Sequence, residues 1–363
     1  MNPIFILKQG GKMSEYLEQQ APINIVRNPW RRFFARTFDL ALYGIFLTSI
    51  EMLVLRINTT GKPLISIAEG FISCLIMLVL EPLMLSTVGT TPGKWIFGLF
   101  LRNSYGEKVS FSKGFDRTLA VFGRGLGYGI PIYNLVREYK SYQSCDQGEE
   151  LSWDEGFSYH IKDTSGFRIL GFLVSWALIY AVIFFIVIQA SLPINRGNIT
   201  AEEYIENCND FMSYNEIDFG KKLMSDGTWS KTSSYSSDSY MIYFGTSTLP
   251  NHQVITNNGE IQKVVLEIED DSDAFIYNFS NHLVIAYTAF VGADKSLNHK
   301  SLYSDEVVHY LNNGFENFEF EIAGFKVSNE VEVSGYQTAS SILVPKENEK
   351  QYFHLTFTIE RIQ

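Results

Sequence analysis

Carboxylate side chains stand inside long apolar runs of this sequence, where an ionised group is costly and is usually either paired or functional. Glu51 and Glu81 each interrupt such a run, and Glu69 lies close to the beginning of the second one. A carboxyl group that is withdrawn from water holds its proton more tightly and can exchange it near neutral pH. These glutamates are therefore candidates for a proton or ion site. The alternative is that they form ion pairs that fix how helices pack.

Basic residues that could neutralise these carboxylates occur in the same half of the sequence. Arg36 precedes Asp39 by three residues, so the two side chains share one face of a helix and can pair with each other. Arg124 stands in an apolar, glycine-rich stretch, and we expect it to neutralise one of the membrane carboxylates. These charged residues together define a polar cluster as the candidate site.

The sequence shows no spacing of residues that would suit covalent catalysis or metal binding. Cys74, Cys145 and Cys208 are scattered without metal-type spacing, and the histidines of the second half follow no ligand spacing. The glycines of residues 123–129, GRGLGYG, neither follow a strand nor open a nucleotide-binding fold, so we assign them to helix packing. The sequence therefore predicts no catalytic residue, no metal and no cofactor, and we do not expect an enzyme.

Three apolar runs are long enough to position these charges within a membrane. Residues 37–55, 64–86 and 167–190 each approach or exceed the ~20 residues that a spanning helix needs. Arginines precede the first run and glutamates follow the third. Basic residues favour the cytoplasmic side, which predicts a cytoplasmic tail at residues 1–26 and an extracytoplasmic C-terminal half.

A fourth apolar stretch, residues 114–136, differs from the three spans. It contains Arg117, Arg124, four internal glycines and Pro131. A straight helix facing lipid would not accommodate these residues cheaply, whereas an interrupted backbone is tolerated where protein shields it. We therefore favour a broken or re-entrant helix over a third crossing at this position.

The second half of the chain, residues 195–363, has a different composition. It holds 11 of the 29 basic and 25 of the 40 acidic residues, so it carries a net charge of -14. Such a domain repels nucleic acid. Residues 200–224 are predicted to be helical, with Thr200 and Glu203 as a capping box. Alternating segments at 263–268, 318–325, 327–333 and 353–359, with helices at 282–291 and 304–313, predict a soluble α+β domain with a mainly antiparallel sheet.

Three segments of the membrane half resemble signature motifs of the RDD family of bacterial membrane proteins. They are RRFFARTFD at 31–39, TTPGKWIFGL at 90–99 and SWDEGF at 152–157. The resemblance implies that Arg36, Asp39 and Asp154 are the family's arginine and two aspartates, and that Thr91, Pro92, Gly93 and Lys94 form its conserved motif. It covers residues 27–165 of a transmembrane domain expected at 27–192. It also implies a role in transport, with cation/proton exchange in some members.

Two hypotheses follow for the function. In the first, the protein handles an ion or solute in the bilayer; three crossings are few for a carrier, so a homo-oligomer is required. In the second, the domain at residues 195–363 binds an envelope protein and the membrane half anchors it. The length of this domain favours the second hypothesis, because a carrier needs no such addition.

Overall fold

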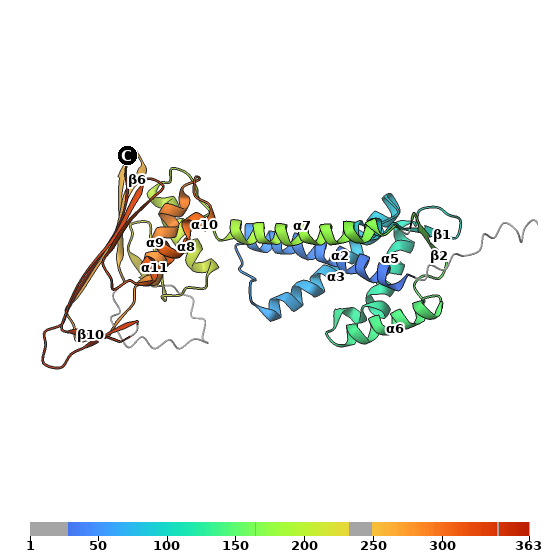
Figure 1. Ribbon diagram of the computed structural model, residues 1–363, viewed down its shortest axis with the longest axis horizontal. Helices are drawn as coiled ribbons and strands as arrows, with labels where there is room; N and C mark the ends of the chain where they lie inside the picture. Colours follow the sequence, from blue (N-terminus) through green and yellow to red (C-terminus); the bar gives the residue numbers. More distant parts are fainter. Residues whose placement is uncertain (1–27, 164, 232–248, 340, 363) are drawn as a thin grey trace, which may run out of the picture. The chain divides into compact units, whose positions relative to one another are not determined.

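The structure, a computed structural model, describes residues 28–163, 165–231, 249–339 and 341–362 (Figure 1). The chain divides into two compact units. The first comprises Met1–Val54 and Thr59–Phe185, and the second comprises Leu55–Asn58 and Ile186–Gln363. The tail expected at residues 1–26 lies outside the described part of the chain.

Three helices are long and apolar enough to cross a membrane. They are α2 (Pro29–Ser49), which continues as the π-helical turn η2 (Ile50–Val54), α3 (Pro63–Thr87) and α7 (Phe167–Ala190). They coincide with the three predicted spans, so the protein is a polytopic membrane protein. The first helix begins at Pro29 rather than near residue 37, since proline fits the first turn of a helix. The arginines expected to flank the span therefore lie within the helix.

Aromatic and apolar side chains hold the first unit together. Phe34 and Phe38 of α2 contact Phe172 and Trp176 of α7, with ring centroids 5.4 and 6.2 Å apart, respectively. On another face of α2, Tyr43 belongs to a buried cluster of residues from α2, α3 and the segment that follows α5. The helices thus bury a common interior into which polar side chains also project.

Short elements follow α3 and complete the first unit. They are α4 (Pro92–Ile96), β1 (Leu99–Asn103), α5 (Phe111–Ala120), η3 (Val121–Gly125), η4 (Gly127–Gly129), α6 (Tyr133–Gln147) and β2 (Phe157–Ile161). The strands β1 and β2 pair antiparallel, from Leu99 opposite Ile161 to Asn103 opposite Phe157. This pairing brings the residues just before β2 back toward the end of α3 and α4.

The stretch at residues 114–136 is broken, as predicted. The α-helix α5 gives way to a π-helical turn, and the backbone then takes positive φ angles at Tyr128 (58°) and Ile132 (70°). A separate helix, α6, begins at Tyr133 and ends at Gln147, and the left-handed conformation of the next residue, Gly148, terminates it. The sequence does not predict this helix, because its mixed polar composition gives no clear apolar stripe.

The second unit is an α+β domain, as predicted. Its helical elements are α8 (Ala201–Tyr214), α9 (Ser280–Phe290), η5 (Val291–Ala293), α10 (His299–Leu302) and α11 (Asp305–Asn312). Its strands are β3 (Lys221–Leu223), β4 (Trp229–Lys231), β5 (Asn251–Asn257), β6 (Glu260–Asp270), β7 (Ile276–Tyr277), β8 (Phe318–Ile322), β9 (Phe325–Ser334), β10 (Tyr336–Ala339), β11 (Ile342–Pro345) and β12 (Tyr352–Arg361).

The core of the second unit lies between a five-stranded antiparallel sheet and its helices. The strand order is β5-β6-β12-β9-β8, and helices α8, α9 and α11 lie on one side of this sheet (Figure 1). The capping box of Thr200 and Glu203 begins α8 as predicted, but the helix ends at Tyr214 and not at residue 224. The segment predicted as one strand at 318–325 turns at Ala323 and Gly324, which have positive φ angles.

Candidate functional site

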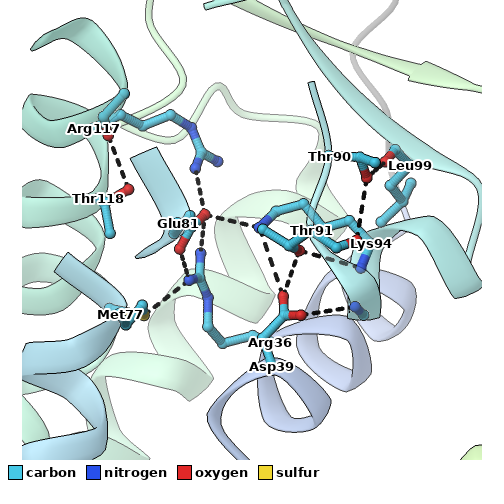
Figure 2. Close-up of polar contacts among 12 residues, drawn as sticks. Arg36, Asp39, Met77, Glu81, Thr90, Thr91, Lys94, Leu99, Arg117 and Thr118 are labelled. Carbon is cyan, nitrogen blue, oxygen red and sulfur yellow. Dashed lines mark hydrogen bonds and ion pairs between the residues drawn. The ribbon is translucent and has the colours of Figure 1, made fainter. Parts of the chain in front are cut away.

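Glu81 forms the centre of the candidate site, because three cations surround it. Its carboxyl group is fully buried on α3 and accepts hydrogen bonds from both terminal nitrogens of Arg36, with the Nη2–Oε1 distance at 3.0 Å. The Lys94 Nζ atom lies 2.8 Å from Glu81 Oε1, and Arg117 Nη1 lies 3.5 Å from the same oxygen. Figure 2 shows the three side chains converging on Glu81 from α2, α4 and α5. Glu81 is thus a shared counter-ion for three helices.

Asp39 holds the short helix α4 against α2. One carboxylate oxygen accepts a hydrogen bond from Thr91 Oγ1 at 2.5 Å, and the other accepts one from the backbone N–H of Gly93 at 2.7 Å. Lys94 Nζ lies 3.9 Å away (Figure 2). A carboxylate that faces the first turn of a helix satisfies N–H groups that have no partner within the helix. Asp39 therefore binds α4 and does not pair with Arg36, which corrects the pairing expected from their spacing.

Gly93 allows this close approach of α4 to α2. A Cβ atom at this position would lie 2.1 Å from the backbone oxygen of Ala35 and 3.0 Å from Asp39 Oδ1. No side chain fits there without moving one of the two helices. Each residue of the motif accordingly has its own role. Thr91 caps α4, Pro92 begins the helix, Gly93 leaves room for the contact with α2, and Lys94 is a buried cation.

Asp154 joins the cluster from the segment just before β2. It pairs with Arg32 of α2 and accepts a hydrogen bond from Arg117 Nη2 at 2.8 Å. The same Nη2 donates to the Tyr159 hydroxyl at 2.6 Å, and the Arg32 guanidinium stacks on the Tyr159 ring at 4.6 Å. Burial raises the pKa of Asp154, but Arg117 and Arg32 outweigh this effect and hold the pKa below its usual range. Asp154 is therefore ionised.

The cluster contains more positive than negative groups. Its four cations are Arg32, Arg36, Lys94 and Arg117, and its three carboxylates are Asp39, Glu81 and Asp154. With all seven groups ionised, four positive charges against three negative charges leave a net charge of +1. We refer to these seven residues as the charge cluster.

Arg124 does not take the place expected for it. Its side chain is exposed, and Arg117, one helical segment earlier, reaches the buried carboxylates instead. The sequence does contain a pattern that could have indicated a buried Arg117, since this residue shares one helix face with Gly114 and Val121. Gly114 faces α3, where its Cβ would lie 3.3 Å from Pro82 Cα. The sequence likewise did not indicate that Arg32 and Lys94 belong to the charge cluster, or that Tyr159 contacts it.

Glu51 lies apart from the charge cluster and pairs with another carboxyl group. It belongs to the π-helical turn η2, and its carboxyl group interacts with that of Glu69 on α3. One oxygen of each carboxyl group is buried without a hydrogen-bond partner among the described residues. A hydrogen bond between two carboxyl groups requires a proton on one of them. The two carboxyl groups can therefore share a proton between two membrane-spanning helices.

The histidines of the second unit include two that are deeply buried. Tyr204 and His252 hydrogen-bond through the hydroxyl and Nδ1 at 2.7 Å, and His282 stacks on Phe219 with centroids 4.2 Å apart. Burial lowers the pKa of both imidazoles to about 3. Within the described ranges, no three His, Cys, Asp or Glu side chains gather closely enough to hold a metal ion. Both histidines are therefore neutral parts of the core.

Acidification should destabilise the second unit. The folded state keeps both histidines neutral down to about pH 3, whereas the unfolded state takes up protons below its ordinary pKa of 6.5. The free energy of unfolding is therefore expected to fall as pH drops from 6.5, by about 1.4 kcal/mol per pH unit for each histidine. Hydrogen exchange of peptides from residues 249–339 in the full chain, measured from pH 7 to 4, tests this.

The variant His282→Leu should reduce this pH slope by about half, because one of the two linked protonation sites is gone. The matched control is His354→Gln, which removes a partly exposed histidine on the sheet. Equal slopes in His282→Leu and in the unchanged protein would contradict the assignment.

Comparison with known families matches residues 26–198 to the model described as the RDD family. The matched region contains the three spanning helices, the broken segment, the charge cluster and the Glu51–Glu69 pair. No curated protein and no solved structure matches the chain.

Proposed function

Since residues 26–198 form a membrane domain of the RDD family, we propose that the protein exchanges a cation for protons across a membrane. The supporting observation is that Glu51 and Glu69 interact between two membrane-spanning helices, and that each keeps one buried oxygen without a hydrogen-bond partner among the described residues. A pair of this kind holds a proton when neutral or singly charged. After losing the proton it offers carboxylate oxygens, the ligands that hard cations prefer. Proton and cation would then compete for the same oxygens, which is the requirement for exchange.

The charge cluster has a different part in this proposal. Glu81 shares three cations and stays ionised, so it is a poor choice for an exchangeable proton. It joins α2, α3, α4 and α5 into one rigid end of the domain. The π-helical turn that contains Glu51 follows the C-terminal end of α2, away from Arg36 and Asp39, and such turns often mark functional positions in helices. We therefore assign proton exchange to Glu51 and Glu69, and scaffolding to Glu81.

Flux measurements in proteoliposomes test the proposal. Reconstituted protein should couple a pH gradient to uptake of a monovalent cation, and Glu51→Gln should abolish this coupling because an amide cannot give up a proton. The control is Glu150→Gln, which removes an exposed carboxylate outside the spanning helices. If Glu51→Gln and Glu69→Gln both exchange cations at the unaltered rate, the carboxyl pair does not carry the activity. Cross-linking in the same liposomes should report the homo-oligomer that three spans require.

The orientation that accompanies this proposal places the charge cluster on the cytoplasmic side of a bacterial inner membrane. Arg31, Arg32 and Arg36 begin α2, and acidic residues follow α7 in the second unit. This arrangement supports a cytoplasmic start and a periplasmic second unit. Alkaline phosphatase fused after residue 363 should be active, and fused after residue 145 it should be inactive. An active fusion at both positions would contradict the orientation.

The second unit supports a second candidate function as an envelope binding module. It has a core of its own that includes Tyr204, Phe290 and Phe357, and among the described residues this core contains none from the three spanning helices. A carrier needs no such domain. Proteoliposomes made with residues 1–194 alone distinguish the two candidates, because exchange should occur in them if the membrane half is a carrier and should be absent if that half only anchors the second unit.

A further inference from the structure

A cavity of about 690 Å³ lies in the first unit among the beginning of α2, the α5–η3 segment and α6. All four cations of the charge cluster, Arg32, Arg36, Lys94 and Arg117, contribute to its wall. Most of the remaining wall is apolar or aromatic, including Trp30, Leu126, Leu135 and Trp153. The volume is typical of sites that hold organic ligands, about 300–1,000 Å³.

Arg117, one of the cations in the wall of this cavity, has unused hydrogen-bond donors. Its side chain is 1% exposed, and its Nη2 atom already donates to Asp154 and Tyr159. Its Nε and Nη1 atoms have no hydrogen-bond partner among the described residues, although Nη1 lies 3.5 Å from Glu81. Leaving buried guanidinium donors unused is unfavourable. A phosphate or carboxylate oxygen is the partner that suits their geometry.

The charges around the cavity favour an anion. The charge cluster carries a surplus of one positive charge. One further acidic residue, Glu138 of α6, also lines the cavity, and burial raises the pKa of its carboxyl group. It therefore loses its proton less readily and repels an anion less than an exposed glutamate would. An anionic group would balance the surplus charge and occupy the free donors of Arg117.

The rim of the cavity favours an occupant that also has an apolar part. Trp30, Leu135 and Tyr139 line the cavity and are 58%, 66% and 61% exposed, respectively. In a domain with three membrane-spanning helices, exposed Trp and Tyr side chains are favoured where acyl chains meet lipid headgroups. A small soluble anion would leave this apolar wall unfilled, whereas a lipid would cover it with the start of its acyl chains.

We propose that this cavity binds the headgroup of an anionic phospholipid from the surrounding bilayer. The lipid phosphate accepts hydrogen bonds from Arg117 and is attracted by Arg32, Arg36 and Lys94. The acyl chains leave past Leu135 and Tyr139 toward the hydrocarbon. This site is separate from the Glu51–Glu69 pair, so lipid binding and cation exchange can be tested independently. Basic pockets between membrane helices are known to select anionic lipids for the same physical reason.

Native mass spectrometry of the full chain in detergent tests the proposal. Phosphatidylglycerol should bind at least about tenfold more tightly than phosphatidylcholine, since only the first carries a net negative charge. Equal affinity for the two lipids would overturn the proposal. Millimolar inorganic phosphate should leave the bound phosphatidylglycerol in place. Complete displacement by inorganic phosphate would show that the site takes a soluble anion, and would overturn the lipid assignment.

A matched pair of variants on α6 locates the site without disturbing the charge cluster. Leu135→Glu places a carboxylate at the cavity rim, and Val136→Glu places one on the next residue, which is also exposed but does not line the cavity. Leu135→Glu should weaken phosphatidylglycerol binding about tenfold through charge repulsion, and Val136→Glu should leave it unchanged. Equal effects of the two variants would rule out this cavity as the lipid site.

Discussion

Replacing Glu81 by glutamine is expected to cause the largest loss of stability of any single substitution in the first unit. The variant leaves Arg36, Lys94 and Arg117 buried without the carboxylate that they share. Removing one partner from a buried ion pair costs about 3–5 kcal/mol, because an uncompensated charge remains out of water. Unfolding of the full chain by SDS in mixed micelles should show a decrease of this size or a failure to fold.

Two further variants separate this effect from a general loss of charge. Glu107→Gln removes an exposed carboxylate and should change the free energy of unfolding by less than about 0.5 kcal/mol. The double variant Glu81→Gln with Arg36→Gln should be less destabilised than the sum of its two single variants, because it removes one of the orphaned cations. Strict additivity would show that Arg36 and Glu81 do not interact in the folded protein.

Gly93→Ala is expected to have the second large effect, for a steric reason. The new Cβ would lie 2.1 Å from the backbone oxygen of Ala35, so α4 would have to move away from α2. The movement would break the hydrogen bonds from Gly93 N and Thr91 Oγ1 to Asp39 and leave a buried carboxylate without its donors. Overpacking and the lost hydrogen bonds together should cost about 2–6 kcal/mol.

The control for Gly93→Ala is the same substitution at Gly70, which lies in α3 with nothing within 4 Å of its added Cβ. Alanine favours a helix over glycine by up to about 1 kcal/mol, so Gly70→Ala should be neutral or stabilising. The same SDS titration measures both variants. If Gly93→Ala were as stable as Gly70→Ala, the contact between α4 and α2 would not be as close as described.

The spanning helices and the broken segment could be predicted because their signals are local. An apolar run of sufficient length predicts a span by itself, and glycines with Pro131 predict an interruption. The capping box of α8 is also contained within four residues. The end of α8 at Tyr214 was missed, since its last predicted turns form strand β3 instead.

The charge cluster could be predicted only in part, because its contacts join residues that are far apart in the chain. Arg36 and Glu81 are 45 residues apart, and Arg32 and Asp154 are 122 residues apart. Spacing within one helix favoured the wrong partner, Asp39, for Arg36. Lysine is rarely buried, so nothing in the sequence distinguishes the buried Lys94 from an exposed one. The pairing of β1 with β2 that delivers Asp154 is likewise non-local.

The distance along the chain between Arg117 and its partner Asp154, 37 residues, has a consequence for synthesis. When Arg117 emerges from the ribosome, Asp154 is still inside it, and the emerged chain carries a cation in an apolar segment with no counter-ion from that side. Integration of the region between α3 and α7 must therefore wait until the translocon has received the later segment. Chains stalled so that Arg117 but not Asp154 has left the ribosome should remain exposed to membrane proteases, whereas chains stalled after β2 has emerged should be protected.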